Sequence, residues 1–73
     1  MNEKLFERLL MCRKNKGVTQ KETAQSVRIN ERSYQRYEAG EHMPTLEITI
    51  ALADYFGVSI DYLVGRSDDP ERH

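Results

Sequence analysis

Two helix-start signals stand close together in the middle of the chain and constrain its fold more than any other feature. Thr19 and Glu22 form a T-x-x-E capping box, in which each side chain satisfies a backbone N–H left free at a helix start. Asn30, a favoured N-cap residue, opens a second helix that ends at Gly40. Only residues 27–29 are left to join the two helices, so the chain must reverse sharply between them.

The same kinds of signal predict one helix before this pair and two after it. Apolar residues at helical spacing give the first helix a buried face, and Gly17 is placed to end it. Thr45 opens a fourth helix that Gly57 ends, and Ser59 opens a short fifth helix that Gly65 closes. The buried face of the first helix is expected to be Leu5, Phe6, Leu9 and Cys12. The inner face of the fourth is expected to be Leu46, Ile50, Ala53 and Phe56.

These elements predict an all-α fold, a compact five-helix bundle. No stretch of alternating polar and apolar residues is long enough to indicate a strand. We expect one domain at residues 1–66, followed by a frayed polar tail at residues 67–73. The 73 residues leave room for one small domain and no separate effector-binding domain.

Composition argues against several classes of protein. Cys12 is the only cysteine, which excludes an intrachain disulfide. Because the N-terminus shows no export signal, we expect the protein to be located in the reducing cytoplasm. Cys12, His42 and His73 lack metal-ligand spacing, so neither a metal nor another cofactor is expected. No apolar run approaches the roughly 20 residues of a membrane span. Without a nucleophile–base pair or a glycine-rich phosphate loop, we expect neither an enzyme nor a small-molecule substrate.

The formal net charge of −1 hides an uneven distribution. Residues 1–40 carry nine Lys or Arg and five Asp or Glu. Residues 41–73 carry two Lys or Arg and seven Asp or Glu. A basic first half suits a polyanionic partner, because the local charge distribution steers binding more than the total does. Ordinary solvated surface explains the imbalance equally well, so charge alone leaves both interpretations open.

The second helix of the central pair has two distinct faces. Tyr34 and Tyr37 lie three residues apart and are expected to point into the core. Ala24, on the preceding helix, is small enough to lie where the two helices cross. The opposite face carries groups that match base edges in the major groove, since Arg suits guanine, Gln suits adenine and Glu suits cytosine. Its residues are Glu31, Arg32, Gln35 and Arg36.

Several ordered motifs carry a family resemblance. They are GVTQKE at residues 17–22 followed by Ala24, NERS at 30–33, RYEAG at 36–40, PTLE at 44–47 and LADYFGVS at 52–59. Together they resemble the phage-repressor (Cro/cI, Xre-type) helix-turn-helix family over roughly residues 5–65. The resemblance implies a lambda-repressor-like DNA-binding fold and a sequence-specific transcriptional regulator, with repression as the expected sign of regulation.

The resemblance also implies roles for single residues. The helix at about residues 31–38 would read bases in the major groove, with Gln35 on the same face as the matched base-reading residues Glu31, Arg32 and Arg36. Phosphate contacts are expected from helix starts and from the loop after Gly40, at Thr19, Gln20, Asn30, Ser33 and His42. Structural support of the helix is expected from Ala24 and from Arg13 and Glu38, which match a pair that ties the first helix to the recognition helix.

The expected partner is a double-stranded DNA operator. One recognition helix covers too few base pairs to specify an operator, so we expect a homodimer on a near-palindrome, with half-sites about 34–36 Å apart. The predicted dimer interface is Val58, Ile60, Tyr62 and Val64, at the end of the domain where family members often pair. The alternative is an antitoxin-like or adaptor module without specific DNA binding, which would have no reason to present Arg32 and Arg36 with Gln20.

Three positions depart from the family pattern. Arg28 stands in the turn where Gly is usual, and we expect it to adopt a positive φ, offset by a bond to a helix-end carbonyl, a carboxylate or a DNA phosphate. The alternative is a turn of different geometry with negative φ. Thr23 stands where a larger apolar residue is usual. The loop after Gly40, which is usually basic, reads Glu41-His42-Met43.

Overall fold

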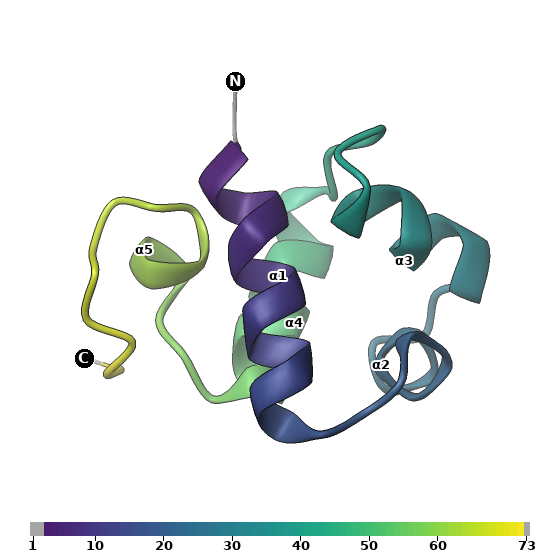
Figure 1. Cartoon of the computed structure of the whole chain (residues 1–73), viewed down its shortest axis with the longest axis horizontal. Coiled ribbons are helices and arrows are strands. Elements are labelled where there is room, and N and C mark those ends of the chain that lie inside the picture. The colour runs from purple at the N-terminus through teal and green to yellow at the C-terminus, as the bar shows by residue number, and fades with distance from the viewer. Residues whose placement is uncertain (1–2, 73) are drawn as a thin grey trace.

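A computed structural model describes residues 3–72 and confirms the all-α architecture (Figure 1). Five helices follow one another, and no strand occurs among the described residues. They are α1 Glu3–Lys16, α2 Gln20–Ser26, α3 Glu31–Glu38, α4 Leu46–Phe56 and α5 Ile60–Leu63. In this view α1 runs through the middle of the molecule, with α2 and α3 on one side, α5 on the other and α4 behind it.

The predicted N-caps are confirmed, because each side chain satisfies a backbone N–H that the first helical turn leaves free. Thr19 Oγ1 accepts from the backbone N of Glu22 at 3.0 Å, and Glu22 Oε1 accepts from the backbone N of Thr19 at 2.9 Å. Asn30 caps α3 through the N–H of Ser33 at 2.7 Å. The caps of α4 and α5 are Thr45 and Ser59.

The core forms where α1 meets α3, α4 and α5. Cys12 is buried there as expected, and burial raises the pKa of its thiol while the Arg8 guanidinium acts in the opposite direction. Ala24 is buried between α2 and α3, where a larger side chain would push the two helices apart. The largest fully buried side chains are Leu5, Leu9, Thr23, Tyr34, Leu52 and Leu63.

The inner face of α4 differs from the expected one. Leu46 and Ile50 are 71% and 39% exposed, so their assignment to the core is wrong, whereas Ala53 is buried and Phe56 packs against the core. Successive helical residues are 100° apart, which puts Leu46 about 120° around the helix from the fully buried Leu52. The apolar residues of α4 therefore extend beyond its buried face and leave part of their surface in solvent.

Two buried threonines occupy positions where apolar side chains would be usual. Thr23 and Thr49 are 0% and 6% exposed. Each hydroxyl donates to the carbonyl oxygen of the N-cap one turn earlier, Thr23 to Thr19 at 3.0 Å and Thr49 to Thr45 at 2.8 Å. Burial is tolerated because these hydrogen bonds satisfy the polar atoms. This arrangement explains how Thr23 replaces the larger apolar residue of the family.

Residues 67–72 fold back over the helices, so the expectation of a frayed tail is wrong. Arg8 of α1 is 7% exposed and donates from Nη1 to the carbonyl oxygens of Tyr62 at 2.8 Å and Ser67 at 3.0 Å. Its Nη2 lies 2.8 Å from Asp68 Oδ1. The guanidinium carbon also lies 3.9 Å from the centroid of the Tyr62 ring, a cation–π contact that packs the arginine against α5.

The end of the tail is held by two further contacts. The backbone N of Ser59 donates to the carbonyl oxygen of Pro70 at 3.1 Å, and Arg72 Nη2 lies 2.5 Å from Asp54 Oδ1. The tail is thus packed against the end of α4 and the start of α5. The domain boundary after residue 66 stays a prediction, and residues 1–2 and 73, at the ends of the two expected segments, lie outside the described residues.

Within residues 3–72, no helix is long and apolar enough to cross a membrane. Among the same residues, no three His, Cys, Asp or Glu side chains are grouped so that they could hold a metal ion. His73 lies outside this range.

Candidate nucleic-acid interface

The turn between α2 and α3 confirms the expected left-handed conformation of Arg28, whose φ is 62°. The backbone N–H groups of Arg28 and Ile29 donate back to the carbonyl oxygens of Gln25 at 3.2 Å and Ala24 at 3.0 Å, which closes the end of α2. The Arg28 side chain is exposed and makes no hydrogen bond or ion pair with the described residues. The expected bond to a carbonyl or carboxylate of the chain itself is therefore wrong, and the phosphate contact stays a prediction.

The turn presents α3 with the two faces that the sequence predicts. Tyr34 and Tyr37 are 0% and 8% exposed, and their rings meet edge to face with centroids 6.5 Å apart. On the opposite side Glu31, Arg32 and Gln35 are exposed, and Arg36 is half-buried. The aromatic pair therefore anchors the helix and turns its polar face to solvent.

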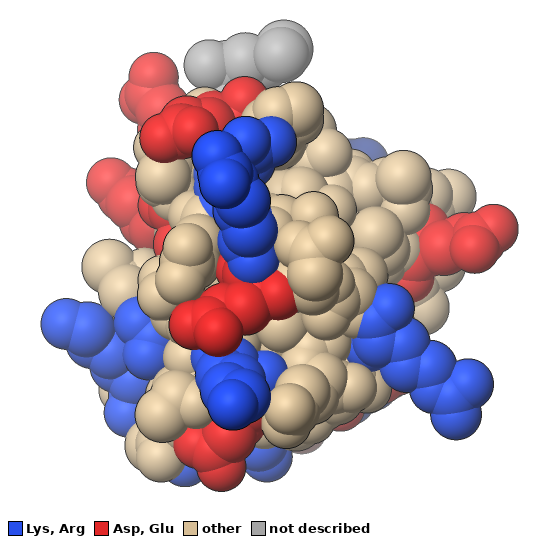
Figure 2. Space-filling view, turned by 90° about the vertical axis from the view of Figure 1, so that its right-hand side faces the viewer, with Lys and Arg blue, Asp and Glu red and all other residues tan. Residues whose placement is uncertain are grey.

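This polar face lines an open hollow of about 630 Å³. The four predicted base-contacting residues all line it, together with Ala39 and Glu41 from the segment that follows α3. Figure 2 views the molecule from the side on which α2 and α3 lie, and basic and acidic side chains are interspersed over that surface. The hollow therefore combines hydrogen-bond donors and acceptors and is not a uniformly positive patch.

The predicted phosphate-contacting residues fall into three groups. Thr19 and Asn30 use their side chains as helix caps, so their oxygens are already engaged by backbone N–H groups. Gln20 donates from Nε2 to Glu38 Oε1 at 3.1 Å, which leaves its amide oxygen and one N–H outside this contact. The structure brings Ser33 and His42 together in a hollow of about 130 Å³ that Arg36, Tyr37 and Met43 complete.

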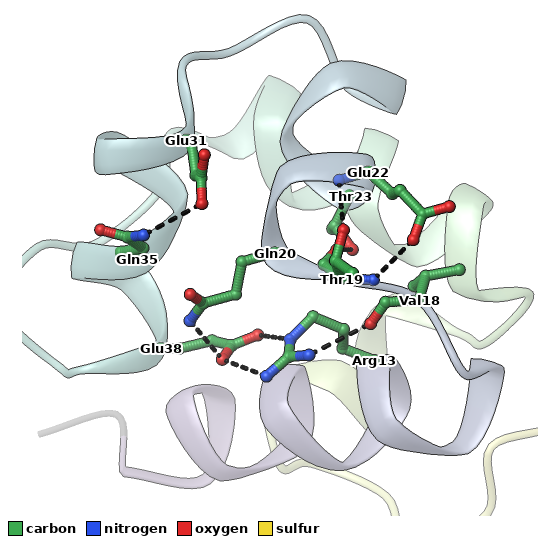
Figure 3. Close-up of polar contacts among 9 residues, drawn as sticks. All are labelled: Arg13, Val18, Thr19, Gln20, Glu22, Thr23, Glu31, Gln35 and Glu38. Carbon is green, nitrogen blue, oxygen red and sulfur yellow. Dashed lines mark hydrogen bonds and ion pairs between the residues drawn. The ribbon is translucent and has the colours of Figure 1, made fainter.

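Arg13 and Glu38 form the predicted tie between α1 and α3 (Figure 3). Arg13 Nε lies 2.6 Å from Glu38 Oε2, and Nη2 lies 3.2 Å from Oε1. Arg13 Nη1 also donates to the carbonyl oxygen of Val18 at 3.1 Å, and Gln20 bonds the same carboxylate from α2. The contact thus joins α1, α2 and the loop between them to the last residue of α3.

The network is largely shielded from water. The Arg13 and Glu38 side chains are 16% and 6% exposed. Burial acts to raise the pKa of Glu38, but hydrogen bonds from Arg13 and Gln20, with the nearby Tyr34 hydroxyl, outweigh it and hold that pKa below its ordinary value. Burial raises the pKa of Tyr34, and the neighbouring Glu38 carboxylate raises it further. Glu38 is therefore held as a carboxylate within the fold.

The predicted dimer residues occupy different environments. Val58 is 8% exposed and belongs to the core, and Tyr62 is half-buried beneath the Arg8 guanidinium. Ile60 is 38% exposed, and Val64 is half-buried. Ile60 thus has the largest exposed fraction of the four residues. The dimer interface itself stays a prediction.

A model of the helix-turn-helix family matches residues 9–63 of the chain. The chain belongs to this helix-turn-helix family. The match runs from α1 to the end of α5 and confirms the resemblance inferred from the ordered motifs. No solved structure matches the chain.

Curated relatives carry names that fit the helix-turn-helix family. The "Cryptic phage CTXphi transcriptional repressor RstR" of Vibrio cholerae serotype O1 is 43% identical over 63 residues, which cover 86% of this chain and 56% of that protein. The uncharacterized HTH-type transcriptional regulator YobD of Bacillus subtilis (strain 168) is 37% identical over 65 residues, which cover 89% of this chain and 58% of that protein. The HTH-type transcriptional regulator ImmR of the same strain is 33% identical over 64 residues, which cover 88% of this chain and 50% of that protein. The chain spans about half the length of the curated relatives it matches.

Sequence reasoning missed one residue of the hollow and one buried charge of α1. Ala39 lines the hollow of α3, and its place one turn beyond Gln35 is the signal that could have found it. Arg8 is the buried charge, and its place amid the apolar residues of α1 is the signal that could have indicated a buried partner. Its partners lie at the far end of the sequence, and no local pattern specifies them.

Proposed function

We propose that this chain binds a double-stranded DNA operator sequence-specifically and acts as a transcriptional regulator, with α3 in the major groove. The observation that carries the proposal is the polar face of α3, where Arg32, Gln35 and Arg36 are held outward by a buried aromatic pair and by the Arg13–Glu38 contact. Repression is the favoured sign of regulation because the relative RstR is named a repressor. We also propose that the protein is located in the reducing cytoplasm.

The side chains of α3 offer complementary base-reading chemistry. Arg32 and Arg36 present only donors and suit the O6 and N7 acceptors of guanine, whereas Gln35 presents a donor and an acceptor and suits adenine. Glu31 only accepts, so its carboxylate can bond either the N4 amino group of cytosine or a donor on a neighbouring side chain. Phosphate contacts from Gln20, Ser33, His42 and the two N-cap residues would fix the register without reading sequence.

We also propose that two copies bind together on a near-palindrome with half-sites about one helical turn apart. Ile60 supplies exposed apolar surface for such pairing, next to Val64 and Tyr62 at the end of the domain. Footprinting and the stoichiometry at saturation test this part. A lone protected half-site in a strictly 1:1 complex would contradict it.

Selection of bound fragments from random DNA with the purified chain tests the proposed function. Arg32→Ala and Arg36→Ala should each weaken binding to the selected site by about 1–3 kcal/mol and relax the preference at one base pair. Gln20→Ala should weaken binding to all sequences alike, as loss of a phosphate contact does. Arg66→Ala removes the same charge just after α5, outside the α2–α3 unit, and is the matched control.

Two outcomes would overturn the assignment. If both arginine variants bound the selected site as the wild type does, α3 would not be the reading helix. If the wild type selected no sequence at all, the antitoxin-like or adaptor function would be favoured, with the acidic second half of the chain as its candidate surface.

A further inference from the structure

A hydrogen bond joins two of the candidate base-reading side chains to each other. Gln35 Nε2 lies 3.2 Å from Glu31 Oε2, one helical turn away on α3 (Figure 3). Both residues are exposed, and both line the hollow on the polar face. Glu31 makes no ion pair with Arg32 or Arg36 in the described structure, so its partner on this face is the glutamine.

The chemistry of the pair fixes the orientation of the amide. A glutamine amide has an oxygen that accepts and a nitrogen that donates twice, and rotation by half a turn exchanges them. An ionised carboxylate only accepts, so it favours the amide nitrogen on its side and repels the amide oxygen. Glu31 therefore distinguishes two orientations that an isolated glutamine would populate alike.

We propose that Glu31 is a positioning residue that holds the Gln35 amide in the orientation that reads adenine. One N–H bonds Glu31, which leaves the carbonyl oxygen and the second N–H to face the groove. Adenine presents an acceptor at N7 and a donor at N6, and it is the base to which an amide bonds in this two-point way. The inference rests on the proposed function, because it assumes that α3 enters the major groove.

The effect should be confined to one base pair. Arg32 and Arg36 carry donors only, so no carboxylate is needed to choose between their orientations. Guanine offers two acceptors, which arginine donors can bond directly. Thymine and cytosine each offer a single polar group, to which an amide of either orientation can bond. Loss of Glu31 should thus weaken the preference for adenine opposite Gln35 and leave the preferences opposite the arginines in place.

Four variants of the full chain test the proposal in selections from random double-stranded DNA. Gln35→Ala identifies the position in each half-site that Gln35 reads, where the wild type should select adenine. At that position Glu31→Ala and Glu31→Gln should lower the preference for adenine about twofold, because neither supplies an acceptor-only group. Glu31→Asp keeps the carboxylate at a spacing that bonds glutamine on a helix, and it should restore most of the preference.

Glu41→Gln is the control for charge, because Glu41 lines the same hollow and its loss removes one negative charge. It should raise affinity for many sequences and leave the adenine preference unchanged. The side-chain amide resonances of Gln35 give a readout without DNA. They should shift in Glu31→Ala and Glu31→Gln and stay close to the wild type in Glu31→Asp.

The possible results separate this inference from the proposed function. Failure of the wild type to select any sequence would overturn both. A selected site with a base other than adenine at the Gln35-dependent position, or an adenine preference unchanged in Glu31→Ala, would overturn the positioning role alone. If the Glu31 variants changed the base preference only at a different base pair, Glu31 would read a base of its own. That result would also overturn the positioning role.

Discussion

Arg13 and Glu38 meet through two nearly parallel contacts, with Nε 2.6 Å from Oε2 and Nη2 3.2 Å from Oε1. The pair joins the central helix α1 to the last residue of the helix that carries the candidate base-reading side chains. Such fork-to-carboxylate geometry fixes orientation as well as distance. The position of α3 relative to the core therefore depends on a polar contact as well as on the packing of Tyr34 and Tyr37.

Glu38→Gln should destabilise the fold substantially. It leaves Arg13, only 16% exposed, with its charge uncompensated, and breaking a buried ion pair in this way costs roughly 3 kcal/mol. Urea unfolding at neutral pH measures the loss. Glu41→Gln, an exposed change of the same kind, should stay within about 0.5 kcal/mol of the wild type. Equal losses in the two variants would show that the pair contributes nothing specific.

The same carboxylate predicts a dependence of stability on pH. The pKa of Glu38 is below its ordinary value in the folded state, so its contribution is complete above the unfolded pKa of about 4.3 and is lost as pH falls through the folded pKa. Acid should therefore lower the Tm of the wild type more than that of Glu38→Gln. Thermal melts of both proteins from neutral to acidic pH make the comparison. An equal decrease of Tm with falling pH in the two proteins would contradict the lowered pKa of Glu38.

Arg28→Gly should leave stability unchanged or raise it by up to about 1.6 kcal/mol. A side chain at φ 62° costs about 1–2 kcal/mol, and glycine removes that cost while adding freedom to the unfolded chain worth about 0.4–1 kcal/mol. Arg28→Ala keeps the Cβ and should show no such gain, so the difference between the two variants isolates the backbone. A lower urea midpoint for glycine than for alanine, at equal m-value, would be incompatible with a left-handed turn.

Glu41→Lys should raise affinity for every DNA sequence together. Glu41 lines the hollow on the polar face of α3, where a negative charge opposes the approach of phosphates. One added phosphate contact should steepen the slope of log affinity against log salt by about 0.9. Asp61→Lys makes the same charge change in α5 and should alter the slope less. Identical slopes for the two variants would place the loop after α3 away from DNA.

Much of the fold could be predicted because its helix boundaries depend on local chemistry. Thr19, Asn30, Thr45 and Ser59 each bond an N–H three residues later, so a short stretch of sequence contains the whole interaction. The outward face of α3 followed from the spacing of Tyr34 and Tyr37 in the same way. The Arg13–Glu38 contact spans 25 residues and was predicted from the family resemblance alone.

Other parts depend on partners that no local pattern specifies. The apolar residues of α4 cover more than one face, and only the packed neighbours decide that Leu52 is buried and Leu46 exposed. Thr49 could not be identified as a core residue, since burial depends on the hydroxyl bonding a carbonyl. The tail reads as polar and solvated, yet Arg8, some 60 residues earlier, binds Asp68 and holds it in place.

The docked tail has a consequence for anything attached to this chain. Because Arg8 and Asp54 bind residues 67–72 beside α1 and α4, this segment lies on the side of α1 opposite α3 (Figure 1). A fluorescent label or fused module joined there would project away from the polar face of α3. Residues 67–72 thus direct such an attachment away from the candidate DNA surface.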